Sequence, residues 1–442
     1  MPRRESCSSI WRGWGMSEWT TIAELADTNP GSLPANTDRG FRFRYIDLGS
    51  VDDGAIDWQR VQYISYKDAP SRARRVCITG DALFGTVRPN LQSHGYVPGG
   101  HIDPLVASTG FTVIRAHEDV ADGRYIFFSL LSENILRQSV NAAVGSNYPA
   151  VTDRDVRQFR LFAPPVEQQS KIADVLASLD TQIQKTEALI AKLEKVKEGL
   201  LQDLLTRGID ENGQLRPSPE QAPELYKDSP LGLIPISWEI RNLDQIADVV
   251  DPQPDHRTPP AVEDGVPYVG IGDFDSEGAI DTASCRKVSF SAYEKQKSSF
   301  SVTPGDIIYG KIGTLGRPKK LPNGTYALSA NVVLIQPSSY KALLFYALNS
   351  SRTEKQILDI TNTTSQPALG IEKVRKLLFP IPELGEAEEI SIRLEKLSDC
   401  IQREASRLIS LNLIKQGLMD DLLTGRVRVT PLLDQAQATT PA

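Results

Sequence analysis

The sequence predicts an α+β protein in which two pseudo-twofold-related α/β modules are separated by two long antiparallel coiled-coil helices. Three observations lead to this prediction. The 442 residues exceed what one hydrophobic core usually supports, so two or more domains are expected. The chain also repeats itself, and each copy ends in a long stretch with heptad spacing of apolar residues.

Composition limits the classes of protein that the chain can belong to. The net charge is −7, so any binding of nucleic acid must rest on local basic patches. The four cysteines, Cys7, Cys77, Cys285 and Cys400, lie far apart in the sequence, which argues against a zinc cluster or disulfide framework and for a reducing compartment. No apolar run approaches the roughly 20 residues of a membrane span, and no signal peptide is recognisable. We therefore expect a cytoplasmic protein without a metal site or membrane contact.

The chain begins with fifteen residues, MPRRESCSSIWRGWG, that match nothing later in the sequence. They could form a basic arm, but a disordered extension over residues 1–15 is the favoured interpretation. The first module is predicted over residues 16–161, because Met16 opens a segment that has a counterpart in the second copy.

The repeat is clearest at the end of each copy. The segment from Pro149, PAVTDRDVRQFRLFAPP, aligns with the segment from Pro367, PALGIEKVRKLLFPIPE, at an offset of 218 residues. The alignment continues without a gap to GLLQDLLT at Gly199 and GLMDDLLT at Gly417. Each copy is therefore expected to be one α/β module followed by one long helix, with the second module over residues 236–380.

Two stretches, residues 162–207 and 381–429, alternate apolar steps of four and three, which is the a/d spacing of a supercoiled helix. Either each stripe packs on its own module or the two stripes pack on each other, and the length of over four heptads favours the mutual seam. The predicted seam consists of Ile172, Leu176, Leu179, Ile183, Ile190, Leu193, Leu200 and Leu204 in the first helix, and of Ile390, Leu394, Leu397, Ile401, Leu408, Leu411, Leu418 and Leu422 in the second.

Residues 208–235 are rich in proline and charge and are predicted to be a linker, and residues 430–442 are predicted to be a C-terminal tail.

The second module also contains a glycine-rich motif. The spacing of Gly305, Gly310 and Lys311 resembles a phosphate-binding loop, but Ile312 stands where that loop needs Ser or Thr to bind magnesium. In the first copy Thr86 occupies the position of Lys311, so a repeated Gly-Asp turn is the better interpretation than a nucleotide hydrolase.

These motifs together resemble the specificity subunit of type I restriction-modification enzymes. The resemblance is carried by KIADVLASLDTQI with EGLLQDLLTRG, by YKDSPLGLIPISWE, by the terminal KQGLMDDLLTGRVRV, and by FGTVRPNLQSHGY and GDIIYGKIGTLG in the two modules. It covers Met16 to about Val429, and Thr206 departs from it by opening TRG where TGR is usual, as at Thr424.

The resemblance implies two target-recognition domains, each reading one half of a bipartite double-stranded DNA target, and two helices that set the gap. It implies docking of two methyltransferase (M) subunits and of restriction/translocase (R) subunits. It further implies no catalysis and no cofactor on this chain, with S-adenosylmethionine, ATP and Mg²⁺ on the partners. The sequence agrees, since it holds no intact Walker A motif and no Asn-Pro-Pro-aromatic motif. The alternative is a coiled-coil interaction scaffold whose modules bind proteins.

Candidate DNA contacts are residues whose side chains match base edges or phosphates. Each has a competing interpretation as part of a solvated loop or strand face. In the first module the candidates are Arg42, Arg44, Arg72, Arg74, Arg75, Arg88 and Asn90. In the second they are His256, Arg257, Thr258, Lys311, Thr314, Arg317 and Lys319. Replacement of Arg74 and Arg75 by alanine is expected to weaken binding and flatten its salt dependence.

Overall fold

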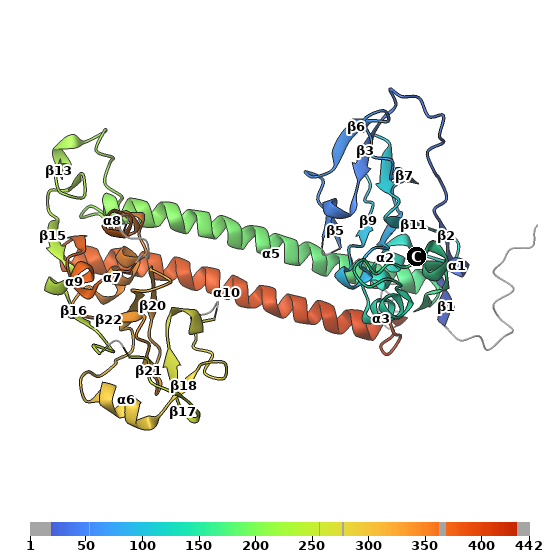
Figure 1. The fold of residues 1–442 in the computed structure, drawn as a ribbon. Helices are drawn as coiled ribbons and strands as arrows, with labels where there is room; N and C mark the ends of the chain where they lie inside the picture. The colour runs from blue at the N-terminus through green and yellow to red at the C-terminus, as the bar shows by residue number, and fades with distance from the viewer. Residues whose placement is uncertain (1–18, 53, 256, 276–277, 362–367, 431–442) are drawn as a thin grey trace, which may run out of the picture. The chain divides into compact units, whose positions relative to one another are not determined.

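Two units of the same plan make up the part of the chain that the computed structural model describes, which is residues 19–52, 54–255, 257–275, 278–361 and 368–430 (Figure 1). One unit combines residues 1–186 with 407–442, and the other spans residues 187–406. The predicted extension over residues 1–15 and all but Thr430 of the predicted tail lie outside the described residues. The boundary between the units cuts both long helices, so each helix contributes one half to each unit.

The first unit contains two four-stranded sheets and two strand pairs. Their orders are β6-β3-β10-β7, β2-β11-β8-β9, β1-β12 and β4 (Val51–Asp52) with β5 (Ala55–Ile56). The strands are β1 (Trp19–Thr21), β2 (Ala26–Thr28), β3 (Arg42–Ile46), β6 (Gln62–Ser65), β7 (Ala73–Cys77), β8 (Ala82–Gly85), β9 (Gly95–Tyr96), β10 (Leu105–Ser108), β11 (Phe111–Ala116) and β12 (Arg160–Phe162). The accompanying helices are α1 (Ile22–Leu25), α2 (Gly123–Leu130), α3 (Glu133–Ala142) and α4 (Asp153–Gln158).

The second unit repeats this arrangement. The sheet β16-β22-β19-β20 and the pair β15-β23 correspond to β2-β11-β8-β9 and β1-β12, and a three-stranded sheet has the order β18-β17-β21. The strands are β15 (Glu239–Asn242), β16 (Ala247–Val250), β17 (Ala261–Val269), β18 (Lys287–Val288), β19 (Ile307–Gly310), β20 (Gly316–Lys320), β21 (Ala327–Leu328), β22 (Val332–Pro337) and β23 (Leu378–Ile381). The helices are α6 (Phe290–Lys297), α7 (Lys341–Leu348), α8 (Ser351–Thr361) and α9 (Ile371–Arg375).

The Gly-Asp turn before β8 and β19 is built in the same way in both units. Buried Asp81 accepts a hydrogen bond from Ile78 N at 2.8 Å and pairs with Arg115 at 2.7 Å. Buried Asp306 accepts from Thr303 N at 2.9 Å and from Gln336 Nε2 at 2.7 Å. The glycine before each aspartate has a positive φ, 92° at Gly80 and 82° at Gly305, which explains the repeated glycine. The turn is therefore scaffold, as the repeat predicted.

Lys311 belongs to this scaffold and not to a phosphate-binding loop. Lys311 N donates to Asn331 O, and Leu369 N donates to Lys311 O. Thr86 has the matching bonds, to Gly110 O and from Val151 N. After Lys311 the chain turns into strand β20 without starting a helix, whereas a phosphate-binding loop delivers its amides at a helix N-terminus.

Helices α5 (Val166–Thr206) and α10 (Leu384–Leu422) pack on each other in both units (Figure 1). In the first unit Ile172 and Leu176 share a buried cluster with Leu422, and Lys415 Nζ lies 2.6 Å from Asp180 Oδ1. In the second unit Leu204 is buried with Ile390 and Leu394. In each unit the beginning of one helix thus meets the end of the other, which is antiparallel packing. All sixteen predicted seam residues are buried or half-buried.

The predicted linker over residues 208–235, called the strap below, is packed against the rest of the second unit. Its strands β13 (Tyr226–Lys227) and β14 (Ile234–Pro235) pair with each other, and Ile209 and Ile234 are buried in the cluster that holds Leu204. Composition alone predicted a connection between modules and not this packing.

A buried histidine makes the first unit sensitive to acid. His94 stacks on Phe84 with ring centroids 4.2 Å apart, and its Nδ1 accepts a hydrogen bond from Gly85 N at 3.1 Å. Burial lowers the pKa of His94 from 6.5 to about 3, because the charged imidazolium would be desolvated.

We expect the first unit to lose stability as the pH falls below 6.5. Between pH 6.5 and 3 the unfolded chain binds a proton at His94 that the folded chain does not bind, so unfolding is favoured by about 1.4 kcal/mol per pH unit. At pH 5 the loss is about 2 kcal/mol. Hydrogen exchange of the Leu83 and Phe84 amides at pH 7.5 and 5.0, corrected for intrinsic rates, measures it. His94→Gln should remove this difference and His117→Gln should not; an equal difference in all three proteins would contradict the prediction.

Candidate nucleic-acid interface

Strand β3 carries two of the predicted contacts on one face. Phe43 and Tyr45 are buried, and the alternation of a strand therefore places Arg42 and Arg44 on the other face. Arg44 Nε donates to Asp103 at 2.8 Å, whereas the guanidinium of Arg42 lies 4.5 Å from the centre of the Tyr63 ring. Arg42 is exposed. Its head group is thus positioned by an aromatic ring and is more available to a ligand than that of Arg44.

The arginines between Arg72 and Arg75 lie in different surroundings. Arg74 and Arg75 are successive in β7, where the pairing with β10 shifts register, and their side chains have different neighbours. Arg74 lies over Tyr66 at 5.1 Å. Arg75 is half-buried and pairs with Asp153 at 2.8 Å, and Asp153 also accepts from Thr112 Oγ1 at 2.6 Å. Arg72, just before the strand, is exposed. A phosphate contact by Arg75 would have to compete with its ion pair.

Arg88 and Asn90 lie at an exposed corner after β8. Arg88 has a left-handed backbone, with φ 50° and ψ 61°, and its guanidinium lies 4.6 Å from the centre of the Tyr148 ring. Asn90 is exposed in the 3₁₀ turn η3 (Pro89–Leu91) that follows.

In the second module the predicted contacts fall on a loop and a hairpin. Arg257 and Thr258 are exposed in the proline-rich loop, and the neighbouring His256 lies outside the described residues. Thr314 is exposed on the turn between β19 and β20, Arg317 is exposed in β20, and Lys319 Nζ lies 5.7 Å from the centre of the Phe274 ring. The turn is tight, because a Cβ at Gly310 would lie 1.7 Å from Thr314 O.

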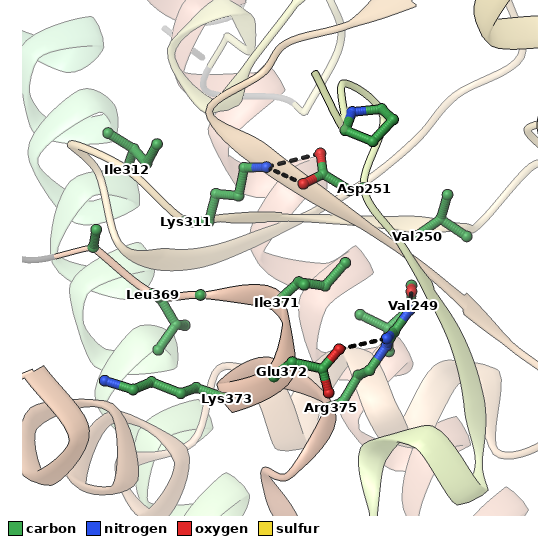
Figure 2. Close-up of a pocket in the computed structure, with 13 residues that line it drawn as sticks. Val249, Val250, Asp251, Lys311, Ile312, Leu369, Ile371, Glu372, Lys373 and Arg375 are labelled. Carbon is green, nitrogen blue, oxygen red and sulfur yellow. Dashed lines mark hydrogen bonds and ion pairs between the residues drawn. The ribbon is translucent and has the colours of Figure 1, made fainter. Parts of the chain in front are cut away.

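Lys311 is the most enclosed of the predicted contacts. Its side chain lines a pocket of about 920 Å³, is 4% exposed, and bonds both oxygens of Asp251 at 2.7 and 2.8 Å (Figure 2). Figure 2 shows a second ion pair on the wall of the pocket, between Arg375 and Glu372 at 2.7 Å. The ammonium of Lys311 is thus held at the pocket wall by its pair with Asp251.

Sequence reasoning missed the partners that orient these arginines. Tyr63, Tyr66 and Tyr148 each lie under a guanidinium, while Asp103 and Asp153 bind the other head groups. Tyr66 lies close to Arg74 in sequence, but nothing in the local pattern distinguishes a stacked tyrosine from a solvated one. The aspartates are distant in sequence and become neighbours only through the folding of the module.

Two general features accompany this surface. Among the described residues no group of three or more His, Cys, Asp and Glu side chains is arranged to hold a metal ion. In the same part of the chain, no helix has both the length and the apolar character that crossing a bilayer requires.

Two modules of one scaffold, each with different exposed cations, joined by a paired-helix element, define a recognition protein rather than an enzyme with one active site. Comparison with known proteins identifies the family to which this recognition protein belongs. The model of the type I restriction modification DNA specificity domain matches residues 45–195 and 235–413, and the chain belongs to this family. It is a DNA specificity subunit of a type I restriction-modification system, a non-catalytic component with two target-recognition domains.

Individual relatives agree over most of their length. The chain is 25% identical over 349 residues to the type I restriction enzyme MjaVIII specificity subunit of Methanocaldococcus jannaschii, covering 74% of this chain and 75% of that protein. It is 21% identical over 348 residues to the EcoBI specificity subunit of Escherichia coli, covering 74% and 70%.

Solved structures share the fold. A chain from a study of assembly and conformational transition of the type I restriction-modification system aligns with a TM-score of 0.56 at 23% identity, over 92% of this chain and 98% of that one. The specificity subunit of M. genitalium aligns with a TM-score of 0.56 at 13% identity, over 92% and 96%. The predicted α+β fold, with two modules and a packed helix pair, is thereby confirmed.

Proposed function

We propose that each target-recognition domain reads one half of a bipartite DNA target and that the helix pair α5 and α10 sets the gap between the halves. The observation that carries this proposal is that the two modules share the same internal framework but expose different residues on their surfaces. The Gly-Asp turn and the bonds around Thr86 and Lys311 repeat, whereas the exposed cations do not. A shared frame with different surface residues is what two half-sites of different sequence require.

The helix pair also offers equivalent docking positions for two methyltransferase subunits. Val196 on α5 and Ile414 on α10 are separated by the repeat offset of 218 residues, and both are exposed apolar side chains. Leu189 and Leu413 add exposed apolar surface to the same helices. Apolar side chains on the outer face of a helix pair favour a protein partner over solvent. We further propose that restriction/translocase subunits join this complex and that it acts in the cytoplasm.

Chemistry belongs to the partners in this proposal. S-adenosylmethionine would be bound by the methyltransferase subunits, and ATP and Mg²⁺ would be used by the partner subunits. This chain would determine which DNA sequence the partner subunits act on. Single-molecule sequencing of methylated bases in the host genome tests the proposal: it should return one motif of two defined halves and a fixed undefined gap. A continuous motif, or none that depends on this chain, would contradict it.

We expect replacement of Arg72 and Arg74 by alanine to reduce the salt dependence of DNA binding. Removing one phosphate contact lowers the slope of log K against log salt by about 0.9, so removing two lowers it by roughly two. Arg75 is left intact because its ion pair with Asp153 also supports α4. Binding titrations of the complex with its methyltransferase measure the slope between about 50 and 200 mM salt.

The matched control is Arg137→Ala, which removes an exposed arginine that pairs with Glu133 on its own helix. It should leave the slope within about half a unit of the parent value. If the Arg72 and Arg74 variant kept the parent slope, neither side chain would contact phosphate.

A further inference from the structure

The corner from Arg88 to Gln92 holds two residues in a conformation that they disfavour. Arg88 has φ 50° and Gln92 has φ 47°, both in the left-handed region, which costs an L-residue about 1–2 kcal/mol. Arg88 also precedes Pro89, and a following proline pushes a residue toward extended backbone. Such conformations persist only where the surroundings impose them, and they cluster at ligand-binding sites.

The surroundings of the corner do impose this conformation. Arg88 N donates to Pro149 O at 2.7 Å, and Leu91 N donates to Arg88 O at 2.9 Å. Gln92 Nε2 donates to Leu131 O at 3.1 Å, which ties the end of the corner to the helical layer. The strained backbone is therefore fixed at both ends.

The guanidinium of Arg88 is oriented without being neutralised. It lies 4.6 Å from the centre of the Tyr148 ring, and Nη2 reaches Asn147 O at 3.4 Å. Arg44 and Arg75, by contrast, donate to Asp103 and Asp153. Across the described part of the chain, no carboxylate forms an ion pair with Arg88, so most of its donors are available to a ligand.

Exposed apolar side chains accompany this guanidinium. Tyr148 is 70% exposed, Val144 is 80% exposed and Leu91 is 60% exposed. Val87 and Val144 both form bridges to Ala150, which joins the corner and the 144–150 segment. Apolar side chains gathered beside a free cation indicate a contact surface and suit the thymine methyl groups of the major groove.

The second module has an independent counterpart. Arg317 has φ 51°, precedes Pro318, and is exposed near the start of β20, the strand that follows β19 in the chain. Strand β19 is equivalent to β8. No carboxylate within the described ranges pairs with it. A left-handed arginine before a proline therefore occurs in each module, beyond the strand that the two modules share.

We propose that Arg88 reads a guanine in the half-site of the first target-recognition domain, with two guanidinium donors on O6 and N7. A phosphate contact needs only a positive charge, which a flexible side chain can supply. Readout of guanine needs the guanidinium plane held in one orientation, and the Tyr148 ring and the fixed corner provide this. Arg317 has the corresponding role in the second domain. This inference rests on the proposed reading of a bipartite target.

The test uses the complex of the full chain with its methyltransferase and a set of duplexes. One duplex carries the mapped target, and the others replace each G·C pair of either half-site by A·T. Arg88→Gly should reduce discrimination at one G·C pair of the first half-site by roughly 5- to 150-fold and leave the second half-site unaffected. Because glycine adopts the left-handed conformation freely, the melting temperature should stay the same or rise.

Two further variants separate the possible roles. Arg88→Lys should lose the same discrimination while keeping the salt slope of the parent, since it retains the charge. Arg60→Ala removes an exposed arginine that pairs with Asp57 and should change neither quantity. Equal weakening on every duplex, full discrimination by Arg88→Gly, or a first half-site without a G·C pair would each overturn the inference. Failure of the parent complex to discriminate in either half-site would instead overturn the proposed function.

Discussion

Replacement of Glu386 by alanine is expected to release the strap from the second unit and to destabilise that unit by about 3–5 kcal/mol, the usual effect of removing one partner from a buried ion pair. Glu386 Oε1 accepts from Ile209 N at 2.9 Å, and Oε2 accepts from Arg216 Nη2 at 3.0 Å and from Trp238 Nε1 at 3.1 Å. Removing the carboxylate leaves a cation and two buried donors without their acceptor.

The packing around Glu386 leaves little room for a replacement partner. A Cβ at Gly208 would lie 2.1 Å from Glu386 Oε1 and 2.5 Å from the Trp238 ring, and Gly208 has a positive φ of 64°. The carboxylate of Glu386 bonds the strap at Ile209 N and at Arg216. Hydrogen exchange over residues 207–238 should therefore accelerate in Glu386→Ala, ahead of exchange in the strands of the second unit.

Glu389→Ala provides the matched control for this prediction. Glu389 lies on the same helix and pairs with Arg393 across one turn at 2.8 Å, a half-exposed pair whose removal costs about 0.3–0.5 kcal/mol. Glu386→Gln should fall between the two, because an amide oxygen can still accept but carries no charge. If Glu386→Ala exchanged no faster than Glu389→Ala, the strap would be held by its apolar contacts alone.

The packing of the strap, by contrast, could not be predicted from the sequence. Helix pairing was predictable, because heptad spacing in both copies repeats the same local signal many times, and the shared plan of the two modules followed from the duplication. The packing of Ile209, Arg216 and Trp238 around Glu386 joins segments about 170 residues apart that share no period. A composition rich in proline and charged residues predicts only that the segment connects the two modules.

The candidate site divides in the same way. Local pattern identified Arg42, Arg74 and Arg88 as cations that could meet DNA, and these remain predictions. It could not separate Arg74, stacked on Tyr66, from Arg75, paired with Asp153, because the difference depends on the neighbours that the fold brings to each side chain. Lys311 illustrates the point most directly. Its pairing with Asp251 spans 60 residues and is produced by the sheet.

Insertion of four residues into α5 after Lys192 is expected to lengthen the tolerated gap between the half-sites by one or two base pairs. Four residues add about 6 Å of helix, and DNA rises about 3.4 Å per base pair. The bases recognised should stay the same, because all candidate contacts lie in the modules and none lies in α5 or α10. Methylation mapping in a host that carries the variant reads out both the bases and the gap.

The inserted residues must also keep the apolar seam of α5 facing α10. Seam positions alternate steps of four and three, so four extra residues return the stripe to nearly the same face of the helix, rotated by about 40°. Seven extra residues keep the heptad phase and should lengthen the gap further, by about three base pairs. As the control of unchanged length, Lys192→Ala with Lys195→Ala alters two exposed positions of the same stretch. A gap that stays constant across the four-residue and seven-residue insertions would show that the helix pair does not set it.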